Sequence, residues 1–259
     1  MFSILPSTTS HKAEPLLPTL EVFARLGFHD IDLNLHHLRE GMVTLDEVLR
    51  ALEANRQRLG IVSGGWCDFF DGSPEIEHTF ASVDRQIAFA RALGVGTLRL
   101  FYGRLPRTDY SIEARGRIAS HFERLSSTYP DMTFAFENHD AASLDPRVCA
   151  DVLQATNRAN IRMNFDPINF ERHGVDSMDA LSVLRPFIQH VHLKGKIGAE
   201  NCEFGAGDCD LTPLLRSLVA GGYSGAFTVE YEGRFDRTLR LYTSARHAAA
   251  VLASISGVV

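Results

Sequence analysis

The chain has 259 residues, of which 45% are hydrophobic and 22% charged, and its 26 Lys and Arg stand against 32 Asp and Glu for a formal net charge of -6. This is the composition of an ordinary globular protein, which excludes a disordered or fibrous chain. The acidic balance without any basic run argues against a nucleic-acid partner, and no segment reaches the ~20 apolar residues of a membrane span.

The N-terminus and the cysteines predict a cytoplasmic location. Residues 1–12 lack the basic n-region of a signal peptide, and their apolar stretch is too short. Cys67, Cys149, Cys202 and Cys209 form no C-x-x-C pair, and a chain of this size does not depend on disulfides. We therefore expect reduced thiols and no membrane partner.

Short β-branched or aromatic runs alternate with longer amphipathic stretches from end to end, which is the pattern of repeated βα units around a parallel sheet. The predicted strands are residues 2–5, 30–33, 60–64, 97–101, 133–137, 161–166, 188–193 and 226–230. Eight such units predict the α/β class and a single (β/α)8 TIM barrel, with residues 1–259 as one domain.

The predicted helices lie between these runs. Gly27 and Gly94 suit the left-handed position that follows a helix end. A last helix over residues 237–255 would complete the ring. The helix residues Leu49 and Leu52 are expected to pack against the sheet, as are Phe89 and Leu93.

Four consecutive predicted strands end in residues that can bind a metal. Glu137, Asp166 and Glu230 close three of them, and the fourth carries His190 and His192 on one face, with His192 nearer the strand end. The active site of such a barrel lies at the C-terminal ends of its strands. One charged strand end would merely mark where burial stops, but four in succession favour a functional site.

Three carboxylates and one imidazole make a mixed oxygen and nitrogen site. It suits one divalent ion, Mn²⁺, Mg²⁺ or Co²⁺, with Zn²⁺ as a further option. The predicted ligands are Glu137, Asp166, His192 and Glu230, and Glu232 is a reserve candidate.

The sequence resembles the xylose isomerase-like TIM barrel family of sugar isomerases and epimerases, which also includes dehydratases and an endonuclease branch. The matching motifs are FENH at 136–139, NFDPIN at 164–169, HVHLK at 190–194, VEYEG at 229–233 and the Gly-rich segment at 204–211. The resemblance implies that the same four residues bind the metal, and that Glu137 and Glu230 also move protons.

Two positions depart from the ketose 3-epimerases of that family. Those enzymes carry a histidine three residues after the aspartate ligand and an arginine six after the histidine ligand, whereas this chain has Asn169 and Gly198. A free ketohexose is therefore a less favoured substrate.

The expected activity is that of a metal-dependent isomerase or epimerase of a small keto-sugar, inosose or hydroxy-oxo acid. The reaction would pass through an enediolate, with Glu137 and Glu230 as the acid/base pair. The alternative is a metal-dependent dehydratase of the dehydroshikimate or inosose type using the same site. An endonuclease or a non-catalytic sugar-binding barrel is less favoured.

The partner of such a site would be a small polyol, keto-sugar or oxo-acid, and association into a homo-oligomer is compatible with the sequence. Further residues follow the predicted strands closely enough to contact a substrate. They are His36, Trp66, His139, Asn169 and Lys194.

Overall fold

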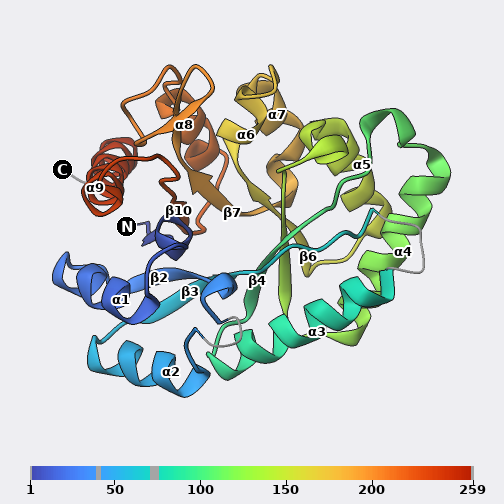
Figure 1. Ribbon diagram of the computed structural model, residues 1–259. Coiled ribbons are helices and arrows are strands. Elements are labelled where there is room, and N and C mark those ends of the chain that lie inside the picture. Colours follow the sequence, from blue (N-terminus) through green and yellow to red (C-terminus); the bar gives the residue numbers. More distant parts are fainter. Residues whose placement is uncertain (1, 39–41, 71–75, 258–259) are drawn as a thin grey trace. The chain divides into compact units, whose positions relative to one another are not determined.

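The computed structural model describes residues 2–38, 42–70 and 76–257. The chain divides into two compact units, each with its own strands and helices (Figure 1). The first unit comprises Met1–Ser63 and Val191–Val259, and the second comprises Gly64–His190.

The first unit is built on short parallel strands. They are β1 (Ile4–Pro6), β2 (Asp30–Asn34), β3 (Arg58–Ser63), the end of β7 (Ile188–Leu193) and β10 (Phe227–Val229). β10 pairs with β1 and with β7, and β2 pairs with β3. A parallel bridge from Ser7 to Asp32 extends the pairing from the end of β1 to β2.

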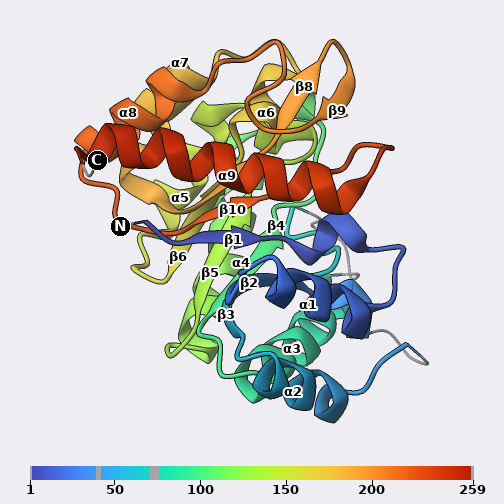
Figure 2. The same ribbon diagram turned by 90° about the vertical axis from the view of Figure 1, so that its left-hand side faces the viewer.

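Helices cover these strands. They are α1 (Leu16–Arg25), α2 (Leu45–Ala54), α8 (Thr212–Ala220) and α9 (Arg237–Ser256). α1 packs beside α2, and α9 packs against α8, β1 and β10, as Figure 2 shows. The short antiparallel hairpin of β8 (Gly195–Ile197) and β9 (Glu200–Cys202) follows β7 and was not expected from the sequence.

The second unit holds β4 (Thr97–Phe101), β5 (Thr133–Glu137) and β6 (Ile161–Phe165), with β5 paired in parallel to both neighbours. Its helices are α3 (Ile76–Ala92), α4 (Ile112–Thr128), α5 (Pro146–Thr156), α6 (Pro167–Glu171) and α7 (Ser177–Leu184). Phe122 of α4 stacks on Phe136 of β5 with 3.9 Å between ring centroids, and Phe69 meets both rings edge-on. This aromatic cluster anchors the helix to the sheet.

Short 3-10 helices follow or precede several strands. They are η1 (Thr8–His11), η2 (Leu35–Leu38), η3 (Arg107–Asp109), η4 (Ala141–Leu144) and η5 (Arg185–Phe187).

The eight predicted strands are present and belong to one parallel sheet. The bounds of three strands match the prediction at both ends, and the bounds of the other five differ by one or two residues at one or both ends. Asp166 and Glu230 lie just beyond β6 and β10. The prediction for Leu49 is wrong. Its side chain is 39% exposed, because Val48 and Leu52, four residues apart, form the buried face of α2.

Candidate metal centre

Glu137 and Asp166 are held at the ends of β5 and β6 by an amide clamp between the two strand ends. The Asn138 side chain donates from Nδ2 to the Asp166 carbonyl at 2.8 Å and accepts at Oδ1 from the Asp166 N–H at 2.9 Å. All three residues are buried. The clamp therefore places two carboxylates side by side inside the second unit.

Asp166 is also the N-cap of α6, and this brings Asn169 to the site. The Asn169 N–H donates to Asp166 Oδ1 at 3.1 Å, and its side chain donates to Glu137 Oε1 at 3.2 Å and to the Asn138 carbonyl at 2.9 Å. One residue therefore orients both carboxylates.

Arg99 of β4 forms a buried ion pair with Glu137. Its Nε lies 3.2 Å from Glu137 Oε2, and both side chains are 3% exposed. Arg99 was not among the site residues predicted from the sequence. A signal was available, since a charged residue inside an apolar strand requires a buried partner, and Glu137 closes the adjoining predicted strand.

His192 and Glu230 form the corresponding pair in the first unit. His192 lies opposite Thr228 in the register of β7 and β10, and the Glu230 N–H donates to the Leu193 carbonyl at 3.0 Å. His192 Nδ1 is 3.5 Å from Glu230 Oε2, and both residues are buried.

Lys194 places a buried ammonium beside Glu230. Its Nζ lies 2.8 Å from Glu230 Oε2 and 3.3 Å from Glu232 Oε2. Burial by itself would raise the pKa of Glu230, but Lys194 and His192 outweigh it and hold that pKa well below its usual range. Glu230 is therefore a carboxylate at neutral pH.

The four predicted ligands form a buried cluster suitable for a metal ion. One ligand atom from each of Glu137, Asp166, His192 and Glu230 lies within 4.8 Å of those of the others. Three oxygens and one nitrogen at this spacing match the coordination chemistry of a divalent ion. Glu232 is not in this group, and it pairs instead with Lys194 and with Lys12.

The residues predicted to bind substrate differ in exposure. Lys194 and Asn169 are buried, His36 is half-buried, and Trp66 and His139 are exposed. His36 donates its N–H to Asn34 Oδ1 at 2.8 Å, and His139 Nδ1 lies 2.9 Å from Asp140 Oδ2.

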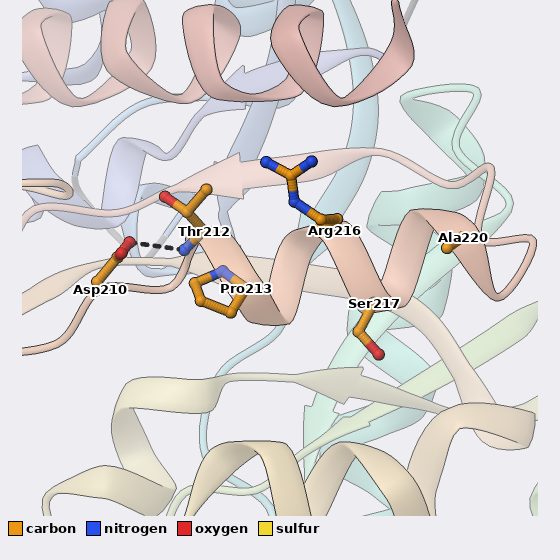
Figure 3. A pocket seen from close by; sticks show the side chains of 6 residues that line it. All are labelled: Asp210, Thr212, Pro213, Arg216, Ser217 and Ala220. Atoms are coloured by element: carbon orange, nitrogen blue, oxygen red, sulfur yellow. Dashed lines mark hydrogen bonds between the residues drawn. The ribbon is translucent and has the colours of Figure 1, made fainter.

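A hollow of about 350 Å³ on α8 is separate from these residues (Figure 3). It is lined by Asp210, Thr212, Pro213, Arg216, Ser217 and Ala220. The Asp210 carboxylate accepts a hydrogen bond from the Thr212 N–H at 2.9 Å. None of the four predicted ligands lines this hollow.

No helix in the described part of the chain is long and apolar enough to cross a membrane.

The xylose isomerase-like TIM barrel family matches residues 20–254. An uncharacterized protein of Escherichia coli, YihM, is 26% identical over 153 residues, which are 55% of this chain and 45% of that protein. The 3-dehydroshikimate dehydratase of Bacillus anthracis is 23% identical over 189 residues, 67% of this chain and 64% of that enzyme. Both alignments thus span less than two thirds of the relative's length.

Solved structures share the fold. An L-ribulose 3-epimerase has a TM-score of 0.84 at 16% identity, covering 99% of this chain and 96% of that one. A Mycobacterium smegmatis xylose isomerase-like TIM barrel protein in complex with magnesium has a TM-score of 0.79 at 15% identity, covering 98% of both chains. The IOLI protein with bound zinc has a TM-score of 0.81 at 15% identity, covering 98% of this chain and 99% of that one.

The chain belongs to the xylose isomerase-like TIM barrel family, and its fold is the (β/α)8 barrel predicted from the sequence. The family includes epimerases and a 3-dehydroshikimate dehydratase.

Proposed function

We propose that this protein is an enzyme that uses one divalent metal ion to abstract a proton next to a carbonyl group, as an isomerase or epimerase. Its substrate would be a small keto-sugar, inosose or hydroxy-oxo acid. The observation that carries the proposal is the buried set of Glu137, Asp166, His192 and Glu230, with ligand atoms within 4.8 Å of one another.

The donor set fits Mn²⁺, Mg²⁺ or Co²⁺, and Zn²⁺ is a further candidate because one donor is an imidazole. Magnesium and zinc are the ions bound in two structures of the same fold. When bound, the ion would stabilise the negative charge that develops on the carbonyl oxygen of the substrate.

Glu137 and Glu230 are the proposed proton carriers. Arg99 and Lys194 each place a buried cation beside one of them. Lys194, together with His192, lowers the pKa of Glu230, so that this group is the carboxylate that can accept a proton. Asn169 donates to Glu137 and limits the rotation of that carboxylate. One glutamate would remove the proton, and the other would return it to the adjacent carbon or to the opposite face.

Exchange of the abstracted proton with solvent tests this step, and the test does not require the product to be identified. The metal content of the purified protein is measured first, and candidate keto-sugars, inososes, hydroxypyruvate and dehydroshikimate are then incubated with the metal-loaded protein in D₂O. We expect deuterium to enter the carbon next to the carbonyl group of at least one compound. Absence of exchange for the whole set, with metal bound, would contradict the proposal.

A dehydratase of the dehydroshikimate or inosose type is the second candidate, since it begins with the same proton abstraction. The relative from Bacillus anthracis is named as a 3-dehydroshikimate dehydratase. Loss of water usually forms a conjugated product, so a rise in ultraviolet absorbance would separate this reaction from isomerisation.

Four further expectations stay predictions: the cytoplasmic location, the single domain over residues 1–259, the homo-oligomer, and the absence of nucleic-acid or membrane partners. The net charge of -6 gives no support to the endonuclease alternative.

A further inference from the structure

The loops that follow β3 and β4 are joined into one rim by main-chain hydrogen bonds. The N–H groups of Phe69 and Phe70 both donate to the Tyr102 carbonyl, at 2.9 and 3.2 Å. The Cys67 thiol donates to the Phe101 carbonyl at 3.3 Å. The two loops are therefore held in one arrangement, and side chains carried by them are preorganised.

Asp68 and Gly103 hold the second loop in place. The Asp68 carboxylate accepts hydrogen bonds from the N–H groups of Arg104 and Phe70, both at 3.1 Å. Gly103 has a φ of +121°, and a Cβ there would lie 1.8 Å from Asp68 Oδ1. Only glycine fits this contact, so Gly103 allows Asp68 to approach the chain and to bind the Arg104 N–H.

Trp66 and Arg104 form a stacked pair on this rim. The Arg104 guanidinium carbon lies 4.2 Å from the centroid of the Trp66 ring, and Trp66 stacks on Phe101 at 5.5 Å and 28°. Trp66 is 41% exposed, and Arg104 is exposed as well. Within the described residues, the contacts of Arg104 are the Trp66 ring and, through its backbone N–H, Asp68.

A continuous set of contacts connects this pair to the metal ligand Glu137. The Phe101 ring lies 4.9 Å from the His139 ring and 4.3 Å from the Arg99 guanidinium carbon. Arg99 in turn is ion-paired with Glu137. The rim pair therefore lies at the same end of the strands as the proposed reaction.

We propose that Trp66 and Arg104 form a recognition element for an anionic group of the substrate, a carboxylate or a phosphate. A guanidinium held over an indole by a cation–π contact makes no hydrogen bond to the ring plane, so its N–H groups can bind the oxygens of such an anion in a bidentate geometry. The Trp66 ring supports the guanidinium, and Phe101 packs against the same indole. The inference rests on the proposed function and narrows its substrate to a small hydroxy-oxo compound with a negative charge.

Trp66 is the one tryptophan of the chain, so its fluorescence reports on binding at this rim. The Mg²⁺-loaded protein is titrated with hydroxypyruvate, dihydroxyacetone phosphate and dihydroxyacetone, which share a hydroxy-ketone group and carry a carboxylate, a phosphate or no charge. Calorimetry measures the same affinities independently. We expect at least one anionic probe to shift the Trp66 emission and to bind about tenfold or more tightly than dihydroxyacetone. Comparison of the two anions identifies which group the rim prefers.

Variants at Arg104 identify the residue responsible. Arg104→Met should remove the preference for the anion, and Arg104→Lys should retain only part of it, because a lysine cannot stack or bind in a bidentate manner. Arg117→Met, which removes an exposed arginine of α4, should leave the preference unchanged.

Three results would overturn the inference: equal affinity for dihydroxyacetone, no response of Trp66 to either anion, or an unchanged preference in Arg104→Met. Mg²⁺ binding is measured separately by calorimetry, with Glu137→Gln as the comparison. A protein that binds no Mg²⁺ but loses an anion preference in Arg104→Met would contradict the proposed function and still support this recognition element.

Discussion

Asn169 determines much of the geometry of the second unit's carboxylates. Its side chain donates to Glu137 at 3.2 Å, and its N–H donates to Asp166 at 3.1 Å. The resemblance to ketose epimerases draws attention to Asn169 because a histidine stands there in those enzymes. In this chain it is 6% exposed and bonds to protein groups, so its predicted contact with substrate stays a prediction.

Replacing Asn169 by alanine tests its positioning role. Residues that orient metal ligands typically contribute 10-fold to 100-fold to metal affinity, so we expect Asn169→Ala to weaken Mg²⁺ binding by about tenfold or more. Calorimetric titration measures the affinity. Gln154→Ala, which removes an exposed amide of α5, is the control, and an unchanged affinity in Asn169→Ala would refute the positioning role.

The glutamine variants Glu137→Gln and Glu230→Gln test proton transfer. Each keeps an oxygen donor but can no longer accept a proton at neutral pH, and loss of general acid-base catalysis costs roughly 10²–10⁴-fold in rate. We expect a loss of this size in kcat, measured at saturating metal with the bound stoichiometry checked. Near-normal turnover by either metal-loaded variant would exclude that glutamate as a proton carrier.

His37 should make stability depend on pH. Burial lowers the pKa of this side chain, with a smaller lowering effect of His36, against the raising effect of the hydrogen bond to the Thr8 carbonyl. The unfolded chain then binds the proton first as pH falls. The folded state therefore has its full stability above about pH 6.5, and this contribution is lost as pH falls toward the lowered pKa.

Urea denaturation between about pH 7 and pH 5 measures this effect. In His37→Gln, where an amide can replace the donor to Thr8, the free energy of unfolding should fall less steeply over that range. If the free energy of unfolding depended on pH equally in both proteins, His37 would not be the source of this pH dependence.

Among the elements, α2 begins with a complete capping box. The Thr44 Oγ1 accepts from the Glu47 N–H at 3.3 Å, and the Glu47 carboxylate accepts from the Thr44 N–H at 2.8 Å. These bonds satisfy donors that the first turn of a helix leaves free. They also explain why α2 starts at Leu45, directly after the cap residue Thr44.

Thr44→Ala should lower the free energy of unfolding by about 1 kcal/mol, the usual loss for an N-cap. Chemical denaturation measures it. Thr243→Ala makes the same change at an exposed position inside α9, where alanine is the better helix former, so no loss is expected there. A similar loss in both variants would indicate that the cap itself does not contribute.

At the scale of the whole molecule, metal binding should stabilise the fold, because the four ligands come from positions between Glu137 and Glu230 and converge only in the folded chain. Free metal at 100 times its Kd contributes about 2.7 kcal/mol. For a protein of this size, that corresponds to a rise in Tm of roughly 5–10 °C.

Removal of the metal with a chelator should therefore lower Tm, and readdition should restore it, as differential scanning calorimetry would show. Glu137→Gln should show a smaller shift. An equal Tm with and without metal would mean that the cluster holds no ion in solution.

The sequence by itself was sufficient for the eight strands, the barrel and the four residues that form the buried cluster, because parallel βα repeats place their functional side chains at strand ends and periodicity is a local property of the chain. Boundaries and partners required the tertiary structure. Leu49 could not be assigned correctly, since the rotation of α2 about its axis depends on what Val48 and Leu52 pack against. The same holds for the buried polar contacts of the site: Arg99 with Glu137, Asn138 with Asp166, and Lys194 with Glu230 and Glu232. The partners in each contact are 28 to 38 positions apart in the sequence, so only the folded structure shows which residues pair. The contact between Arg104 and Trp66 also required the tertiary structure, because it forms only where the loops after β3 and β4 are held side by side.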